Sequence, residues 1–354
     1  MSRHHYGSRL REFTENGFRM LSLENELIRV ELRIDNGGEF SSFLYKPSDT
    51  DFLWHRPVAP RKAPVQSRPR GIDEHVFNDR YLGGWQECFP NGGTSVVYKN
   101  AQLPFHGELL SLDFSLKILR DTPDEVSVLL SVETLRMPFL LEKQLRLRSG
   151  SSVLEIKETM TNLSDQVLDT MWGQHPAFGP PFVDDSCHID FPPCRCTTER
   201  SEPWPESKIH YAVEFDWPNA PLRDGGFRDL SVIPAPDARL TELVFLHGFN
   251  EGWYGVTNGN KKVGFGLRWD ASLFPYLWFW QVFGGFSDYP WFRRNYNFAL
   301  EPFSSFPESG LLKAIENGTA LRFGPHETKE TTILAVAYAG RERINRITET
   351  GEVL

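Results

Sequence analysis

Residues 145–156 read Leu-Arg-Leu-Arg-Ser-Gly-Ser-Ser-Val-Leu-Glu-Ile, and this stretch indicates the kind of fold. Leu145 and Leu147 alternate with arginines before a Ser-Gly-Ser-Ser run, and Leu154 and Ile156 flank a glutamate after it. A two-residue period is typical of a strand with one buried face, and a short run of serine and glycine is typical of a hairpin turn. The stretch therefore predicts two antiparallel strands joined by a tight turn.

The same alternation recurs along the chain. Every second side chain is apolar over residues 28–34, 110–118 and 126–132. One segment, 309–317, has a helical pattern and precedes Gly318, where a left-handed cap costs little because glycine has no Cβ. Many strands without long helices between them pair antiparallel, in two stacked sheets or a closed barrel. We therefore predict an all-β fold with few short helices.

The domain organisation follows from where the strand patterns stop. The chain has 354 residues, a length that suits two ordinary domains or one large all-β domain. Strand patterns continue on both sides of two Pro-rich polar stretches, 57–71 and 191–223, which we interpret as surface loops. We predict a single domain over 17–340, a mobile N-terminal segment over 1–16 and a polar C-terminal tail over 341–354.

Charge and apolar content restrict the partners of the protein. A formal net charge of -9 and a pI near 5.6 argue against the concentrated basic surface that nucleic acids require. No apolar stretch is long enough to span a bilayer, and residues 1–16 lack the apolar centre of a secretory signal. We expect no nucleic-acid partner, no membrane partner, a cytoplasmic location, and a monomer or a homodimer.

The small number of cysteines also agrees with a cytoplasmic location. Four cysteines are too few to cross-link a protein of this size, and a reduced protein is the simplest interpretation. Cys187, Cys194 and Cys196, with His188, are the residues that could bind zinc. Their Cys-x-Cys spacing is shorter than the usual ligand gap, and two prolines crowd the loop. We therefore predict no metal site.

Three short motifs each place an acid-base residue among aromatic residues, glycine or proline. They are Leu-Pro-Phe-His-Gly-Glu, Gln-His-Pro-Ala-Phe-Gly and Leu-Glu-Pro-Phe, which contain His106, His175 and Glu301. Two imidazoles and a carboxylate brought together by folding can protonate one oxygen while deprotonating another, as the opening of a sugar ring requires. The alternatives are a structural histidine at His106 and a salt bridge from Glu301 to Arg293 or Arg294.

Two further stretches have the composition of a sugar-binding wall. Residues 83–93 combine glycines with tryptophan, glutamate and asparagine, and residues 269–281 combine aromatic rings with polar side chains. Sugars bind such surfaces because their C–H faces stack on rings while their hydroxyls meet hydrogen-bonding groups. About half of the aromatic residues in the second stretch are expected in a core strand instead. The candidate substrate-binding residues are Trp85, Glu87, Asn91, Asp270, Trp278 and Gln281.

Taken together, these stretches resemble the aldose 1-epimerase (galactose mutarotase-like) family, in a divergent branch. The resemblance covers most of the chain, from residues 23–40 through His106-Gly107, His175-Pro176-Ala177-Phe178 and residues 274–278 to Leu300-Glu301-Pro302. It implies a large antiparallel β-supersandwich that interconverts the α and β anomers of an aldose. It also implies a small-molecule sugar as the substrate and no metal or organic cofactor.

The resemblance further implies a role for each motif residue. His175 and Glu301 would be catalytic, as the acid toward the ring oxygen and the base toward the C1 hydroxyl, and His106 would bind a substrate oxygen. The chain departs from the family's pattern upstream of His106, where an arginine-containing stretch is expected and Trp85-Gln86-Glu87 stands instead. This departure leaves the identity of the sugar open.

Three other functions fit parts of the pattern. A glycoside hydrolase would use Glu87 and Glu301 as a carboxylate pair at a separation suited to a glycosidic bond. A non-catalytic carbohydrate-binding protein would keep the cleft without the activity. A metal-dependent β-barrel enzyme would need closely spaced histidine ligands, and the chain has no His-x-His.

Overall fold

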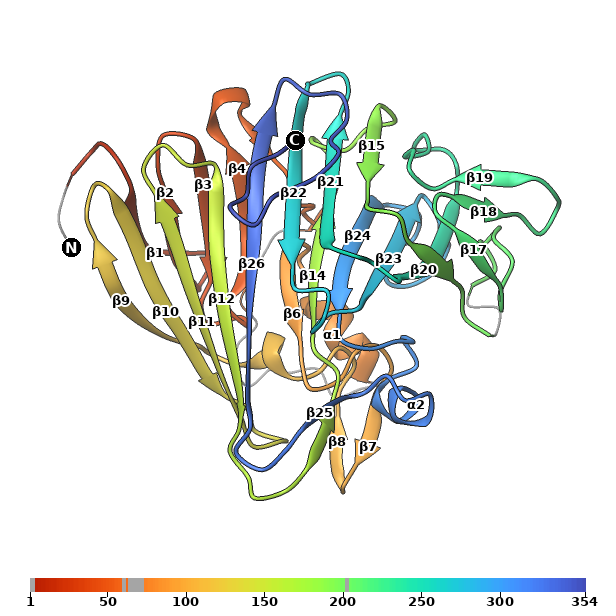
Figure 1. The fold of residues 1–354 in the computed structure, drawn as a ribbon, viewed down its shortest axis with the longest axis horizontal. Helices are drawn as coiled ribbons and strands as arrows, with labels where there is room; N and C mark the ends of the chain where they lie inside the picture. Colours follow the sequence, from red (N-terminus) through yellow and green to blue (C-terminus); the bar gives the residue numbers. More distant parts are fainter. Residues whose placement is uncertain (1–3, 59–61, 63–72, 201–203) are drawn as a thin grey trace.

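Two large antiparallel sheets make up most of the computed structural model, which describes residues 4–58, 62, 73–200 and 204–354 (Figure 1). The larger sheet has 12 strands, with β5 (Thr50–Asp51) paired to β4 off the main path. In spatial order its other strands are β1 (Arg9–Glu15), β2 (Phe18–Glu24), β3 (Ile28–Arg33), β4 (Glu39–Tyr45), β6 (Trp85–Cys88), β14 (Gly173–Phe178), β24 (Tyr296–Phe303), β23 (Tyr276–Phe283), β20 (Leu240–His247), β16 (Arg195–Thr197) and β17 (Glu214–Asp216).

The smaller sheet contains the hairpin predicted from residues 145–156. In spatial order its eight strands are β15 (Cys187–Asp190), β21 (Gly252–Asn258), β22 (Val263–Trp269), β26 (Thr328–Ala339), β12 (Val153–Asn162), β11 (Phe139–Arg148), β10 (Glu125–Glu133) and β9 (Ser115–Asp121). The turn between β11 and β12 includes Gly150, whose φ of 70° is inexpensive only for glycine. Of the predicted strand over 110–118, the part before Ser115 is irregular and includes a 3-10 turn, Leu109–Ser111.

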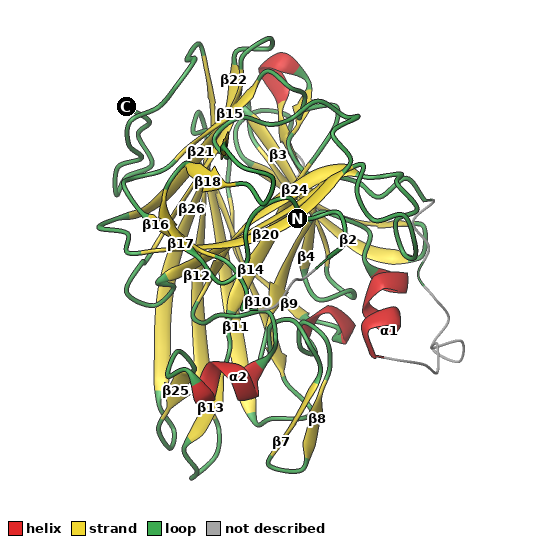
Figure 2. Cartoon of the chain, turned by 90° about the vertical axis from the view of Figure 1, so that its right-hand side faces the viewer, coloured by secondary structure: helices red, strands yellow, loops and turns green. Residues whose placement is uncertain are grey.

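Short hairpins and helices lie outside the two sheets (Figure 2). The two-stranded pairs are β7 (Val96–Tyr98) with β8 (Ala101–Leu103), β13 (Leu168–Thr170) with β25 (Leu321–Phe323), and β18 (Asn219–Pro221) with β19 (Phe227–Asp229). The helix predicted over 309–317 is α2 (Leu311–Glu316). A second helix, α1 (Asp73–Arg80), was not predicted, because only two of its eight residues are large and apolar.

The core lies between the facing sheets. Phe43 of β4 packs edge-on against Phe265 of β22 at 5.3 Å between ring centroids, and Phe178 of β14 lies 5.2 Å from the same ring. Alternation along each strand sends one set of side chains into this core and the other set outward. The architecture confirms the predicted all-β sandwich with few short helices.

The N-terminal segment joins the larger sheet, and the C-terminal tail packs on the smaller one. Within the segment 1–16, residues 9–15 form β1, which pairs along its whole length with β2, and residues 1–3 lie outside the described part. In the tail 341–354, Ile344 and Ile347 are buried, and Ile347 forms a bridge with Val353. Most of the predicted loop 57–71 also lies outside the described residues. No helix in the described ranges has the length and apolar character needed to span a membrane.

Candidate functional site

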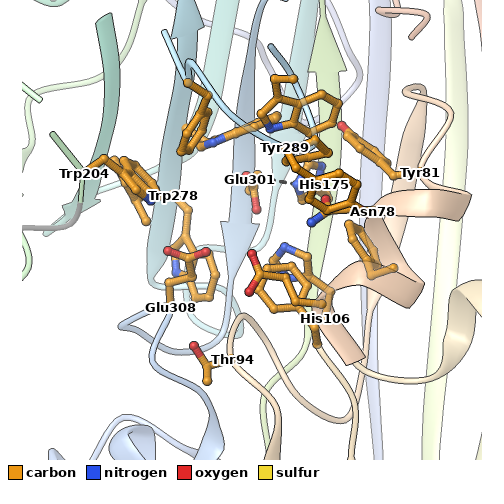
Figure 3. Close-up of a pocket in the computed structure, with 18 residues that line it drawn as sticks. Asn78, Tyr81, Thr94, His106, His175, Trp204, Trp278, Tyr289, Glu301 and Glu308 are labelled. Carbon is orange, nitrogen blue, oxygen red and sulfur yellow. Dashed lines mark ion pairs between the residues drawn. The ribbon is translucent and has the colours of Figure 1, made fainter. Parts of the chain in front are cut away.

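A cavity of about 280 Å³ lies on the larger sheet, over four neighbouring strands. β14 contributes His175, β24 contributes Glu301, β23 contributes Trp278 and Trp280, and β20 contributes Leu243. The helix α1 and several loops supply the rest of the wall, and His106 lies in one of these loops. Figure 3 shows the labelled side chains arranged around one hollow, on one face of the sheet. The three acid-base residues predicted from separate motifs therefore line one cavity, whose volume is near the lower end of small-molecule sites, about 300 Å³.

His175 and Glu301 face each other across two adjacent strands. The register of β14 and β24 pairs Gly173 with Phe303 and Ala177 with Ala299, which places His175 and Glu301 opposite one another midway between. Their Nε2 and Oε1 atoms are 3.4 Å apart, and the side chains are only 5% and 2% exposed. This contact replaces the salt bridge to Arg293 or Arg294 that was considered from the sequence. A buried acid and a buried base are thus held side by side by the sheet.

Burial decides where this pair holds its proton. It lowers the pKa of His175 to about 4. Burial, and then the charge of Glu308, raises the pKa of Glu301 well above its usual value. Burial therefore favours the neutral form of each side chain, with the proton of the pair on Glu301. The roles implied by the resemblance need a protonated His175 and an ionised Glu301, and burial opposes both charged forms in the ligand-free state.

His106 is fixed in one tautomer by the backbone. The Gly93 N–H donates to His106 Nδ1 at 3.0 Å, so the neutral ring carries its hydrogen on Nε2. Burial, and then the charge of His175, lowers the pKa of His106 well below its usual value. The His106 backbone, with φ of 56°, is in the left-handed region, and its ring lies 5.4 Å from that of His175. His106 is therefore a neutral hydrogen-bond donor beside the pair.

Aromatic rings make up much of the cavity wall. Trp278 and Trp280 come from the predicted stretch 269–281. Trp278 is 1% exposed, stacks on Phe303 at 3.9 Å and donates from Nε1 to the Ser305 carbonyl, so it presents only part of its ring. Apart from Leu243 of β20, the lining residues that the sequence did not predict lie on α1 or in loops: Glu74, Phe77, Asn78, Tyr81, Thr94, Trp204, Phe286, Tyr289, Pro290, Trp291 and Glu308. Their types vary without a repeating pattern, so only folding reveals them.

Trp85 and Glu87 were predicted to bind substrate but face the core between the sheets instead. Trp85 Nε1 donates to Gln174 Oε1 at 2.8 Å, and Trp172 Nε1 donates to Glu87 Oε1 at 2.6 Å. Because strand residues alternate, Gln174 points into the core on the opposite side of β14 from His175. Glu87 and Glu301 therefore lie on opposite faces of the larger sheet, and the carboxylate pair proposed for a glycoside hydrolase is not formed.

Glu87 instead belongs to a buried ion network, formed with Lys143, Glu158 and Gln174. Lys143 Nζ lies 2.6 Å from Glu87 and 3.2 Å from Glu158, and Glu158 accepts from Gln174 Nε2 at 2.9 Å. Lys143 and Glu158 are cross-strand partners in the smaller sheet, and Glu87 and Gln174 are partners in the larger one. The network ties the two sheets together directly behind His175.

Asn91 organises loops rather than lining the cavity. Its Nδ2 donates to the carbonyls of Thr94 and Pro104 at 3.0 Å each, and its Oδ1 accepts from the Leu311 N–H at 2.8 Å. Asn91 is fully buried, which explains why its polar atoms are all used within the protein. It therefore fixes the loops that bring Thr94 and His106 to the cavity.

Asp270 and Gln281 also lie outside the cavity. Asp270 is exposed in the turn after β22 and accepts from the Ser272 N–H at 2.8 Å. Gln281 alternates with Trp280 and points to the opposite face of β23, where Arg228 donates to its Oε1 at 2.7 Å. Neither residue can meet a ligand bound beside His175.

The cysteine-rich stretch forms no metal centre in the described part of the chain. No group of three or more His, Cys, Asp or Glu residues there has an arrangement that could hold a metal ion. Burial raises the pKa of Cys187 to about 12 and that of Cys194 to about 12, so both thiols stay protonated. These cysteines behave as small core residues.

Several solved structures share this fold. A galactose mutarotase-like protein from Clostridium acetobutylicum is 13% identical, with a TM-score of 0.64 over 94% of this chain and 99% of that one. A galactose mutarotase related enzyme from Lactobacillus acidophilus is 16% identical, with a TM-score of 0.58 over 93% and 98%. A galactose mutarotase-like protein from Lactobacillus casei is 16% identical, with a TM-score of 0.56 over 90% and 100%. The predicted galactose mutarotase-like fold is confirmed.

Sequence comparison adds the family. No curated protein matches the chain. One family model does match it, DUF4432, which is described as a domain of unknown function and extends over residues 15–336. This match covers most of the chain, which therefore belongs to the DUF4432 family.

Proposed function

We propose that this protein is an epimerase that interconverts the α and β anomers of an aldose by opening and closing the sugar ring. The observation that carries the proposal is the buried contact of 3.4 Å between His175 and Glu301 in a cavity that also contains His106. Ring opening needs one group to remove a proton and another to supply one, and this pair offers both within reach of one small ligand. The fold shared with galactose mutarotase-like proteins supports the same reading.

The reaction conserves the single proton of the pair. In the reactive state Glu301 is ionised and His175 is protonated, which requires the proton to move from Glu301 to His175. Glu301 then takes the proton of the C1 hydroxyl while His175 gives one to the ring oxygen. The C1–O5 bond breaks, and C1 becomes an aldehyde. Rotation about C1–C2 and the reverse proton transfers close the ring as the other anomer.

His106 and the tryptophans position the sugar in this scheme. The Nε2–H of His106 donates to a substrate oxygen, a role that its fixed neutral tautomer suits. The faces and edges of Trp278 and Trp280 meet the C–H surface of the ring. Such contacts hold the anomeric carbon beside His175 and Glu301. Positioning of this kind supplies a large part of the rate increase.

The direct test is an exchange measurement by NMR. Saturation of the C1 proton of one anomer should be transferred to the other anomer faster when the protein is added to a free aldose. The screen should include neutral aldoses, uronic acids, sugar phosphates and amino sugars. If the rate of anomer exchange with the protein equals the rate in buffer alone for every sugar in the screen, the proposed activity is rejected.

The pH dependence of kcat/KM should be bell-shaped with a broad plateau. Below an apparent pKa of about 4, His175 binds a second proton and the pair has no base left, so activity is lost. Above the raised pKa of Glu301, the pair loses its only proton and has no acid, so activity is lost again. Anomer exchange measured across the acid and alkaline ranges checks both limbs. An acid limb near neutral pH would contradict this assignment.

A further inference from the structure

The cavity is acidic, and this restricts the charge of its ligand. Its wall includes Glu74, Glu301 and Glu308, and no lysine or arginine lines it among the described residues. Within that part of the chain neither Glu74 nor Glu308 forms an ion pair. The nearby cation Arg56 is not a lining residue; it lies behind the wall, over the ring of the lining residue Trp291 at 5.1 Å, and so occupies one face of that ring. A phosphate or carboxylate entering this cavity would meet only carboxyl groups, would oppose their ionisation, and would find no compensating cation in the wall.

The rest of the wall favours positive charge. Trp204, Trp278, Trp280 and Trp291 line the cavity, together with Phe286 and Tyr289. The faces of such rings carry negative electrostatic potential and attract ammonium groups, most strongly where water is excluded. Carboxylates combined with several aromatic rings form the environment that a protonated amine requires.

Two buried polar atoms in the cavity wall have no hydrogen-bond partner within the described part of the chain and can bind a ligand. Glu301 is 2% exposed, and its Oε2 has no hydrogen-bond partner among the described residues. The hydroxyl of Tyr81, which is 1% exposed, has none there either. Leaving such groups unpaired is costly, and a bound molecule with N–H or O–H donors removes that cost.

Glu308 lies apart from the catalytic pair within the same cavity. Figure 3 shows Glu308 below Trp278, away from His175 and Tyr81, with Glu301 between. Its backbone carbonyl accepts from the Thr94 N–H at 2.8 Å, which fixes the loop that carries it. A sugar whose C1 lies at the pair can therefore direct a substituent toward Glu308.

We propose that the substrate is an amino sugar, whose protonated amine binds Glu308 and Glu74 among the aromatic rings while its anomeric carbon lies at His175 and Glu301. This inference rests on the proposed function and names its substrate class. Burial, and then the charges of Glu199 and Glu74, raises the pKa of Glu308 to about 8. An ammonium group beside Glu308 favours the ionised carboxylate, so binding at neutral pH should release a proton.

The test compares matched sugars that differ in charge. The 2-amino, 3-amino and 6-amino deoxy derivatives of glucose are measured beside their neutral N-acetyl counterparts and beside glucuronate, at a pH where the amines are protonated. For at least one amine, kcat/KM for anomer exchange should exceed that of its N-acetyl counterpart about tenfold. In Glu308→Gln this ratio should fall to about threefold or less, and Glu74→Gln should lower it less, since Glu74 is more exposed. The control Glu330→Gln removes an exposed carboxylate of β26 outside the cavity and should leave the ratio unchanged.

Binding measurements separate this inference from the proposed function. Titration calorimetry in two buffers of different ionisation heat should reveal proton release when the preferred amine binds, and no release with the N-acetyl sugar. Tight binding of an amino sugar with proton release but without anomer exchange would reject the proposed epimerase activity. The same result would support the proposed binding site for the amine. Exchange of glucuronate or of the N-acetyl sugars at the rate of the amines would overturn the amino-sugar assignment.

Discussion

Replacement of Glu301 by glutamine is expected to lower kcat for anomer exchange about 10²- to 10⁴-fold. Glutamine preserves the shape of the side chain but cannot take up or release a proton. The pair would then hold only the imidazole of His175, which cannot serve as acid and base in one step. His175→Ala should have an effect of similar size for the same reason, and the double variant should be little worse than either single variant.

The stability of the Glu301→Gln variant distinguishes a catalytic effect from a folding defect. The pKa of Glu301 is raised above its ordinary value of 4.5, so as pH rises from 4.5 toward the folded pKa this carboxyl ionises in the unfolded chain but not in the folded protein, and the free energy of unfolding falls. The variant lacks this group, so its free energy of unfolding relative to the native protein should increase from pH 4.5 to pH 8. Thermal unfolding followed by circular dichroism at both values checks the sign.

Two outcomes would contradict this prediction. A variant that keeps most of its exchange rate would remove Glu301 from the mechanism. A variant that loses activity together with stability at every pH would show that the side chain holds the fold instead. Glu330→Gln, which removes an exposed carboxylate of the smaller sheet, should change neither the rate nor the melting temperature appreciably.

The fold and the three acid-base residues that line the cavity were the parts that the sequence could predict. Alternation along residues 126–132 and 145–156 reports directly on strands with one buried face, and β10, β11 and β12 form there. His106, His175 and Glu301 were found because acid-base residues are conspicuous in apolar surroundings. The sequence could not give their distances, because the register of β14 against β24 is set by the whole sheet.

The substrate-binding predictions failed where strand direction decides the outcome. All four residues of β6 are buried, so the pattern does not tell which face of the strand meets the cavity and which meets the core. Trp85 and Glu87 turned out to face the core, and Gln281 likewise lies on the far side of its strand from Trp280. Glu308 and Trp204 were missed because loops position them, and loop conformation leaves no periodic signal.

One structural feature had a signal that sequence reasoning overlooked. Lys143 occupies an inward position in the series Phe139, Leu141, Lys143, Leu145, and Glu158 occupies an inward position between Ile156 and Met160. Opposite charges at inward positions of two hairpin strands predict a buried ion pair, because neither charge can be desolvated alone. The facing carboxylate of Glu87 could not be inferred, since it belongs to the other sheet.

Replacement of Lys143 by methionine is expected to destabilise the protein by about 3–5 kcal/mol. Lys143 is 2% exposed and is the cation of the buried ion network, so its removal leaves Glu87 and Glu158 facing each other without a counter-charge. Burial, and then the charge of Glu87, already raises the pKa of Glu158 to about 8, and loss of the ammonium would raise it further. Urea denaturation at pH 7 measures the change in the free energy of unfolding.

The matched control is Lys157→Met on the neighbouring strand. Lys157 makes an ion pair with Glu330 in which the two side chains are 46% and 57% exposed, so its loss should cost no more than about 1 kcal/mol. Equal effects of the two substitutions would show that the buried network contributes no more than an exposed pair. The penalty of Lys143→Met should also shrink at acid pH, where the buried carboxyls become neutral.

Because Gln174 of the network directly precedes His175, anomer exchange should weaken in Lys143→Met even at a temperature where the variant remains folded. The triple variant with methionine at Lys143, Glu87 and Glu158 should recover only part of the stability, since it removes the buried charges but leaves the N–H donors of Trp172 and Gln174 unpaired. Failure of the triple variant to recover exchange would then mean that the network, beyond joining the sheets, orients the strand that carries His175.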